Sequence, residues 1–384
     1  MNGRFLAGFA PAFVLLAAWA VAPATADTLT DASRAVLKAE KIDPALMSGL
    51  DKELAVPAAL VAAAKKEGEL RVRLQMHERE FAGVAKVFNA RYPGIELKYS
   101  RGIGKERAVG PLIAYKNGTF VAEVLSAYES LLSEWRKIDG LTKISDLPAY
   151  GSLRKEIQTK EGTDAGDKLN HWCMIYSPER VNKADLPKRW DDLLTNPRWK
   201  GGKVGIAHNA GIIWYTPLMA ELGETWGTNF LAKLFNEVKP QLRKETLAAF
   251  GKLVAVGEFD LGFGVADYIV ERDARKGVPV ASHCPDPIPT TWGYLGIPKG
   301  GPHPNAAKLF LNWYISKEGQ LANYHYARQL PVHGGLEVKE LLPYPEVVMG
   351  KKKAYRTAEV LEKVAGKAVK QWEEHWAAIQ PPTN

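Results

Sequence analysis

Cysteine is scarce in this chain: the 384 residues include two, Cys173 and Cys284. So few cysteines exclude a disulfide-rich scaffold, and neither one has the neighbouring residues of a metal cluster or of a catalytic thiol. The two can form one disulfide or remain two buried thiols. Both alternatives stay open, because the sequence alone does not place their Cα atoms within bridging distance.

Long apolar runs are also scarce, and after the N-terminus no segment is apolar for long enough to cross a membrane. Residues 1–26 have their own pattern, in which Arg4 precedes an apolar stretch at 5–21 and the small residues Ala24 and Ala26 follow. This order predicts a cleavable secretory signal peptide rather than a membrane anchor, with cleavage before Asp27. No cysteine lies near that point to take a lipid, so we expect a periplasmic, secreted protein that is not membrane-anchored.

Recognisable nucleic-acid-binding motifs are missing too, although the chain is basic, with a formal net charge of +8 and a pI near 9.1. Such a surplus suits nucleic acid, an acidic surface or an anionic small ligand. No zinc-finger, helix-turn-helix or RNA-binding signature accompanies it, and export argues against nucleic acid. We therefore expect a monomer whose partner is a small molecule or metal ion.

What the sequence does contain is an alternation of helices and strands. A helix is expected at 57–67, with Gly68 as its stop, followed by a strand at 69–74, a helix at 80–91 and a strand at 95–99. This rhythm predicts parallel sheets covered by helices, and the length predicts two domains. Further helices are expected at 109–116, 130–138, 212–222, 246–256, 305–324 and 352–379, and further strands at 122–125, 171–176, 203–207, 261–265, 278–282 and 294–297.

Several segments resemble the solute-binding proteins of bacterial ABC importers, and within them the ferric-ion-binding branch. The most specific are GIPKGGPHPNAAKLF at 296–310, which runs on to SKEGQ at 316–320, and WDDLL with NPRWKG at 190–201. Weaker matches are AKKEGEL at 64–70 and RYPGI at 91–95. Together these segments extend over most of residues 58–336.

The resemblance implies a two-lobed α/β clamshell of the type 2 periplasmic-binding-protein class. Each lobe is then a mostly parallel sheet flanked by helices, with extra helices at both ends of the chain. The expected domains are the signal peptide at 1–26, a helical N-terminal extension at 27–57, a discontinuous first lobe at 58–174 and 278–384, and a second lobe at 175–277. The ligand would lie between the lobes, where strands end and loops lead into helices.

Strand ends in the first lobe therefore nominate site residues. His77 and Glu78 follow the first strand, and the resemblance places a metal-binding histidine at His77. Ser100 and Arg101 end the second strand, where a hydroxyl and a guanidinium suit a carboxylate or phosphate. Tyr128 follows the third strand, at a position where ferric-binding relatives commonly carry a glutamate. For each of these residues, a role in the surface or the core is the alternative.

In the second lobe, His208 and Asn209 precede a helix whose N-terminus would favour an anion or would simply be capped. Asp267 and Tyr268 stand where ferric-binding relatives carry adjacent tyrosines, a departure that puts iron in doubt. His77, Tyr128, Asp267 and Tyr268 would nevertheless form a reasonable Fe(III) set. Two tryptophans, Trp292 and Trp214, lie near the expected cleft and would either stack on a ligand or belong to the core.

The sequence thus predicts the periplasmic component of an ABC importer, which delivers its ligand to an inner-membrane permease and requires no cofactor. Ferric iron as cargo, alone or with a synergistic anion, is the first expectation. A small organic or phosphorylated anion, bound for transport or for sensing, is the alternative. No catalytic arrangement has persuasive spacing, so an enzyme on the same fold is a third and weaker possibility.

Overall fold

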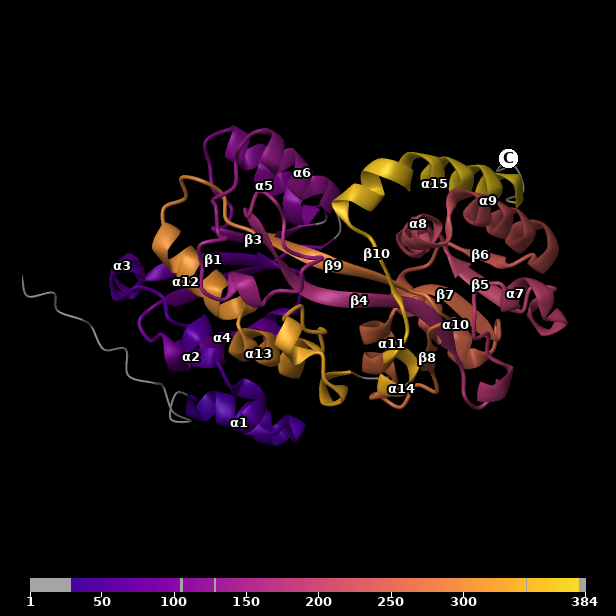
Figure 1. Cartoon of the computed structure of the whole chain (residues 1–384), viewed down its shortest axis with the longest axis horizontal. Helices are drawn as coiled ribbons and strands as arrows, with labels where there is room; N and C mark the ends of the chain where they lie inside the picture. The colour runs from indigo at the N-terminus through magenta and orange to yellow at the C-terminus, as the bar shows by residue number, and fades with distance from the viewer. Residues whose placement is uncertain (1–28, 104–105, 128, 343, 380–384) are drawn as a thin grey trace, which may run out of the picture.

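A computed structural model describes residues 29–103, 106–127, 129–342 and 344–379, so the predicted signal peptide at 1–26 lies outside the described residues. The described chain forms two lobes, each with its own hydrophobic core. Two long strands, β4 (Asp164–Tyr176) and β9 (Ile288–Gly296), run from one lobe to the other (Figure 1).

The first lobe follows the predicted alternation closely. Leu70, Val72 and Leu74 alternate with partly exposed residues along β1, so one side of this strand faces the core. Strand β1 pairs in parallel with β2 and with β3. The lobe contains β1 (Glu69–Leu74), β2 (Glu96–Arg101), β3 (Val124–Ala127), α3 (Ala58–Glu67), α4 (Glu78–Arg91), α5 (Glu106–Lys116), α6 (Glu129–Lys137), α12 (Pro304–Ile315) and α13 (Lys317–Ala327).

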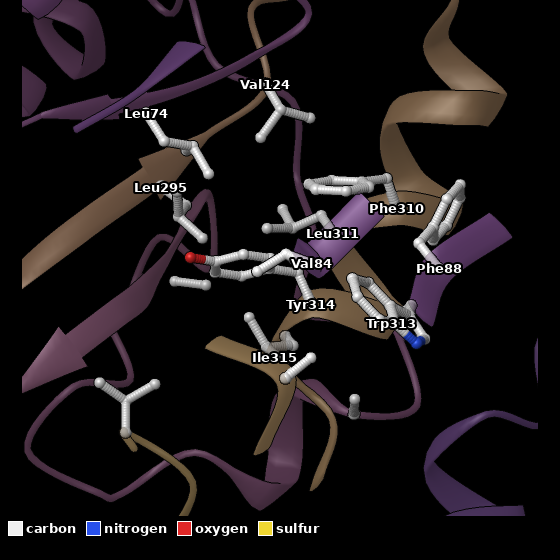
Figure 2. Packing of buried hydrophobic residues seen from close by; sticks show 14 of the residues in the cluster. Leu74, Val84, Phe88, Val124, Leu295, Phe310, Leu311, Trp313, Tyr314 and Ile315 are labelled. Atoms are coloured by element: carbon white, nitrogen blue, oxygen red, sulfur yellow. The ribbon is translucent and has the colours of Figure 1, made fainter. Parts of the chain in front are cut away.

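Aromatic side chains fill much of the first core. Figure 2 shows Phe88 of α4 beside Phe310 and Trp313 of α12, and its ring lies 5.2 Å from each of theirs. Burying each such side chain contributes about 1.5–3 kcal/mol to folding. The single helix expected at 305–324 is divided at Ser316, which has extended backbone and caps α13 with its hydroxyl.

The second lobe is a smaller sheet with helices around it, and β5 pairs in parallel with β6 and β7. In its core Trp190 stacks on Trp214 with ring centres 5.4 Å apart, so the core role holds for Trp214. The lobe contains α7 (Asp192–Thr195), β5 (Val204–Ala207), α8 (Gly211–Leu222), α9 (Glu224–Lys233), β6 (Gln241–Arg243), α10 (Leu247–Val256), β7 (Leu261–Ala266), α11 (Asp267–Ala274) and β8 (Ala281–His283).

The two long strands join the lobes through one continuous sheet, in the order β2-β1-β3-β9-β4-β7-β5-β6. Strand β4 pairs antiparallel with β9 along its first half and with β7 and β8 along its second. The sequence predicted only the apolar end of β4, at 171–176. Its first half was missed because buried polar residues occupy it, among them Asp167, Lys168 and Asn170.

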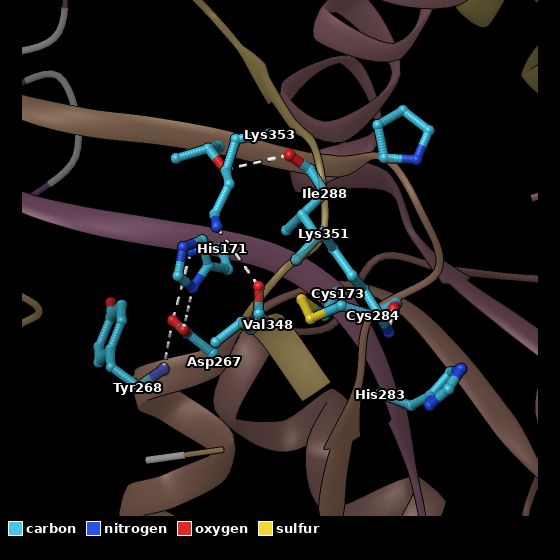
Figure 3. Close-up of a disulfide and its surroundings, with 12 residues drawn as sticks. His171, Cys173, Asp267, Tyr268, His283, Cys284, Ile288, Val348, Lys351 and Lys353 are labelled. Carbon is cyan, nitrogen blue, oxygen red and sulfur yellow. Dashed lines mark hydrogen bonds and ion pairs between the residues drawn. A yellow bond between two sulfur atoms is a disulfide. The ribbon is translucent and has the colours of Figure 1, made fainter. Parts of the chain in front are cut away.

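Cys173 of β4 forms a disulfide with Cys284, which follows β8, with Cα atoms 4.6 Å apart (Figure 3). The structure thus answers a question that the sequence left open. Both residues are buried, and they lie where the second lobe leads into β9.

The C-terminal segment corrects one expectation. It comprises α14 (Pro345–Val348), β10 (Lys353–Tyr355) and α15 (Ala358–Ile379), and the prediction placed all of 278–384 in the first lobe. Instead, α15 lies across α8 and α9 (Figure 1), and Trp372 and Trp376 belong to the second core. The reason is local: an apolar side at Val364, Ala368, Trp372 and Trp376 finds its partners in the second lobe.

The N-terminal extension contains α1 (Asp31–Glu40) and α2 (Leu50–Glu53), and both contact α13. Ser33 hydrogen-bonds the buried Glu318, which also pairs with Arg91 of α4. Glu53 accepts from His333 at 2.9 Å and from the backbone N–H of Lys317 at 2.8 Å. In the part of the chain that the structure describes, no helix has the length and apolar character needed to cross a membrane.

Candidate functional site

Two adjoining pockets lie where the lobes meet. We call the first the tryptophan pocket, after Trp172 and Trp292, and the second the histidine pocket, after His77. They measure about 860 and 740 Å³ with the space open to solvent included. The tryptophan pocket is lined by Gln75, Arg107, Glu129, Lys168, Asn170, Trp172, Ile213, Leu247, Tyr268, Thr291, Trp292, Gly293, Tyr294 and Arg356.

The lining comes from both lobes and from the strands that join them. Gln75 follows β1 of the first lobe, whereas Ile213, Leu247 and Tyr268 belong to α8, α10 and α11 of the second. Gln75, Lys168 and Tyr268 line both pockets. A ligand in either pocket would therefore touch both lobes.

Gln75 holds two cationic side chains at the pocket wall. Its Oε1 accepts hydrogen bonds from Arg107 Nη1 at 2.9 Å and from Lys168 Nζ at 3.1 Å. Lys168 is 4% exposed, and burial lowers its pKa. The nearest carboxylate oxygen, Asp167 Oδ2, lies 4.0 Å from its Nζ, which is the outer limit of an ion pair. The cations are thus held by a neutral amide.

The lining contains one carboxylate, Glu129, beside the three cationic side chains Arg107, Lys168 and Arg356. Glu129 pairs with Arg136, whose Nη1 also donates to Asp164 Oδ1 at 3.0 Å. Burial, helped by the nearby Glu129, raises the pKa of Asp164 to about 6 despite the Arg136 guanidinium. The charge that the tryptophan pocket presents to a ligand is therefore positive.

Aromatic side chains form a further part of the wall of the tryptophan pocket. Trp172 donates its indole N–H to Thr291 Oγ1 at 2.8 Å, and Trp292 lies 5.9 Å from the ring of Tyr294. The indole nitrogen of Trp292 and Oδ1 of Asn170 are buried and have no hydrogen-bond partner among the described residues. This wall combines a flat apolar surface with one donor and one acceptor that a ligand can satisfy.

The structure brings three further predicted residues to the histidine pocket: His77, Arg101 and Tyr268. His77 is exposed and caps α4 in a capping box with Glu80, and Arg101 Nη2 lies 3.5 Å from its Nε2. Two predicted neighbours lie outside both pocket linings. Glu78 is exposed on the first turn of α4, and Ser100 accepts a hydrogen bond from Arg73 at 3.1 Å.

The Asp267 carboxylate is buried and hydrogen-bonded to protein groups. It is 2% exposed, its Oδ2 lies 2.9 Å from His171 Nδ1, and its Oδ1 accepts the backbone N–H of Tyr268 at 2.9 Å (Figure 3). It lines neither pocket. With its carboxylate occupied in this way, Asp267 positions the start of α11.

The anion site predicted at His208 and Asn209 is crossed by α15. His208 packs against the ring of Trp376 at 4.4 Å, its Nε2 lies 3.5 Å from Glu373, and it lines neither pocket. Tyr128 and the Asn209 side chain lie outside the described part of the chain. Of the four residues predicted to bind iron, the structure brings His77 and Tyr268 to one pocket.

Across the described residues, no group of three or more His, Cys, Asp or Glu side chains is placed to hold a metal ion. The residues that sequence reasoning missed are Arg107, Lys168, Asn170 and Arg356. Lys168 and Asn170 lie in the polar half of β4, where alternating charged and small residues concealed a strand. The sequence signal that could have found Lys168 is its place just before the apolar run of the strand expected at 171–176.

Known proteins resemble this chain at several levels. The family model described as bacterial extracellular solute-binding protein matches residues 129–349. An uncharacterized protein of Haemophilus influenzae is 35% identical over 151 residues, which span 37% of this chain and 42% of that relative. The match to this curated relative thus covers less than half of its length.

Solved structures share the fold. Iron-bound HitA from Pseudomonas aeruginosa is similar with a TM-score of 0.64 at 21% identity, over 80% of this chain and 99% of HitA. Trichodesmium IdiA (FutA) in complex with iron and citrate has a TM-score of 0.63 at 19% identity, over 80% and 99% of the two chains. The substrate binding protein of an ABC transporter from Agrobacterium tumefaciens has a TM-score of 0.62 at 15% identity, over 81% and 96%.

Identities this low establish the fold alone, and they confirm the predicted two-lobed α/β class. The family model goes further, because its match extends over more than half of the 384 residues. This protein belongs to the bacterial extracellular solute-binding proteins.

Proposed function

We propose that this protein is the periplasmic component of an ABC importer and that it captures a small organic anion in the tryptophan pocket. The bound protein would deliver its ligand to a membrane permease, and no catalytic step is needed. Membership of the solute-binding family supports the transport role. The choice of ligand rests on the charges and surfaces of the pocket.

The convergence of Arg107 and Lys168 on Gln75 carries the proposal. A buried ammonium is costly, Asp167 reaches Lys168 only at the 4.0 Å limit of an ion pair, and a bound anion would add a second counter-charge. Glu129, the one carboxylate of the lining, pairs with Arg136, so the three cations of the lining outnumber the acidic groups that face them. The pocket therefore favours a carboxylate or phosphate group over a cation.

The aromatic and aliphatic part of the lining favours a ligand whose body is apolar or aromatic. Trp172, Trp292 and Tyr268 line the pocket together with the aliphatic Ile213 and Leu247. Flat indole rings stack on rings of a ligand, and the aliphatic side chains exclude water from it. An anion with an organic body fits this combination better than a bare inorganic ion.

A ligand that contacts both lobes would allow a permease to recognise the loaded protein. Tyr268 belongs to α11 of the second lobe, Gln75 follows β1 of the first lobe, and β4 and β9 connect the lobes. A ligand that contacts both lobes stabilises the arrangement in which they are close together. A permease that recognises that arrangement would distinguish loaded from empty protein.

A thermal-shift panel tests the proposal. Benzoate and phenyl phosphate would raise the melting temperature by several degrees, because a ligand at about a hundredfold its Kd adds about 2.7 kcal/mol of stability. Benzamide, which has the same ring without the charge, would not. Lys168→Met would abolish the benzoate effect, whereas the matched surface variant Lys137→Met would keep it. Stabilisation by benzamide equal to that by benzoate would exclude charge recognition.

Ferric iron is a second candidate, favoured by one specific observation. His77 and Tyr268 line the same pocket, and imidazole and phenolate are suitable Fe(III) ligands. The similar structures of HitA and IdiA contain iron. Fe(III)-citrate added to the apoprotein would then produce a tyrosinate-to-iron charge-transfer band that Tyr268→Phe removes. A spectrum without this band, together with an unchanged melting temperature, would reject iron.

A further inference from the structure

The C-terminal segment brings an additional arginine to the tryptophan pocket. Arg356 directly follows β10, which pairs in parallel with β9, and its backbone N–H donates to Thr290 at 3.0 Å. Thr357 then caps the helix that follows, accepting the N–H of Val360 at 3.1 Å. The arginine is therefore fixed between a strand that joins the lobes and the first turn of α15.

The Arg356 side chain lines the pocket, and among the described residues it forms no ion pair. Its Nε is buried and has no hydrogen-bond partner among the described residues, and burial lowers its pKa. The charged and titratable groups that act on it are Tyr294 and Glu129, and Glu129 pairs through Oε1 with Arg136, which also pairs with Asp164. A half-buried guanidinium without an ion-pair partner is unfavourable in the unliganded protein, and a bound anion would offset this cost.

A second unsatisfied donor lies in the same pocket. Trp292 is 6% exposed, and its buried indole nitrogen has no partner in the described chain. Both Arg356 and Trp292 line the tryptophan pocket and not the histidine pocket. Two donors without acceptors, one of them charged, indicate a place for an oxyanion.

Several close contacts hold the C-terminal segment against the second lobe. Trp372 of α15 lies so close to Gly211 of α8 that a Cβ at that glycine would be 1.9 Å from the indole. Gln371 Oε1 accepts from the Tyr215 hydroxyl at 2.9 Å, and Trp376 covers His208. The segment 353–379 also lies beyond residues 129–349, which the family model matches. Arg356 thus lies outside the matched region.

We propose that Arg356 is an anion-anchoring residue that the C-terminal segment contributes to the tryptophan pocket. Its guanidinium binds a carboxylate or phosphate oxygen of the ligand, while the ligand body lies against Trp292. A planar guanidinium can bind two oxygens of one such group, which a lysine cannot do. This inference rests on the proposed function and names the residue that selects the charged group.

Titration calorimetry with benzoate and with phenyl phosphate tests the inference. Since charge-assisted hydrogen bonds are the strong ones, Arg356→Gln should weaken the binding of both probes by about tenfold or more. Arg356→Lys keeps the charge but loses the paired donors, so it should restore part of the affinity. Lys370→Gln removes one charge from the exposed face of the same segment and should bind both probes as the wild type does.

A second measurement separates an anchoring role from a structural one. If Arg356 serves to bind a ligand and stabilises nothing in the unliganded protein, unliganded Arg356→Gln should have a melting temperature equal to or above that of the wild type. A fall of several degrees would identify Arg356 as a structural residue and overturn the inference. If the wild type binds a probe and Arg356→Gln binds it equally well, the inference is overturned but the proposed function is not. If the wild type binds neither probe, the proposed function is overturned as well.

Discussion

Asp267 and His171 form a buried pair that joins the start of α11 to β4, with the carboxylate Oδ2 2.9 Å from the imidazole Nδ1 (Figure 3). Asp267 also accepts the backbone N–H of Tyr268. Tyr268 is the residue of the second lobe that lines both pockets. A carboxylate that the sequence suggested as a ligand thus holds in place the tyrosine next to it.

Replacing this carboxylate should cost stability. Asp267→Ala leaves His171 and the Tyr268 N–H without their acceptor, and we expect the free energy of unfolding to fall by about 2–3 kcal/mol. Chemical denaturation measures the change. Asp146→Asn, at a carboxylate whose side chain is 63% exposed, is the matched control and should be nearly neutral. Equal stability of the Asp267 and Asp146 variants would contradict the structural role.

The disulfide should contribute strongly to stability because it closes a long loop. Cys173 and Cys284 are 111 positions apart, and constraining a loop of that length in the unfolded chain is worth about 4–5 kcal/mol in the chain-entropy model. The double variant Cys173→Ser, Cys284→Ser should therefore melt well below the wild type. A reductant should lower the melting temperature of the wild type and leave that of the double variant unchanged.

Local patterns predicted most of the elements, because helices and strands in both lobes carry regular apolar spacing. The strand expected at 69–74 coincides with β1, and the helix expected at 212–222 begins one residue earlier, at Gly211. Long-range contacts decided what the patterns could not. The placement of α15 depends on which lobe offers a surface to Trp372, and nothing near that residue in the sequence specifies it.

The site was harder to predict than the fold. Strand ends led to His77, Arg101 and Tyr268, which the structure places in one pocket lining because strand ends gather where the lobes meet. Lys168 lies within a strand, and Arg356 arrives from the far end of the chain. Polar residues in loops after strands were the expected ligands, whereas the cations of this pocket come from helix α5, from a buried strand and from the C-terminal segment.

Asp164 predicts a characteristic pH dependence. Its pKa is raised from 3.8 to about 6 by burial, so the folded protein binds a proton between these values that the unfolded chain releases. The contribution of Asp164 is then most favourable below pH 4 and is lost as the pH rises through 6, by an amount on the order of 2–3 kcal/mol. Asp164→Asn does not titrate. Unfolding measured from pH 4 to pH 7 should show the wild type losing stability relative to this variant.

The opposite trend would contradict this prediction. If Arg136 dominated the environment of Asp164, the carboxylate would become more stabilising as it ionised. The wild type would then gain stability relative to Asp164→Asn over the same pH range. The sign of the difference between the two proteins thus distinguishes the burial of Asp164 from its ion pair, even if the magnitude is smaller than expected.

Gly293 lies in β9, one of the two strands that join the lobes, and lines the tryptophan pocket. A Cβ at this position would lie 2.0 Å from Oδ1 of Asp167, which is itself 1% exposed and has little room to move. Gly293→Ala should therefore displace Asp167 and the adjacent Lys168, lowering the free energy of unfolding by about 1–3 kcal/mol and weakening benzoate binding. Gly366→Ala, where a Cβ on α15 meets nothing within 4 Å, should instead gain about 0.5–1 kcal/mol and bind benzoate normally. If Gly293→Ala bound benzoate with wild-type affinity, Lys168 would not take part in recognition, and the anion would have to be held by the remaining cations.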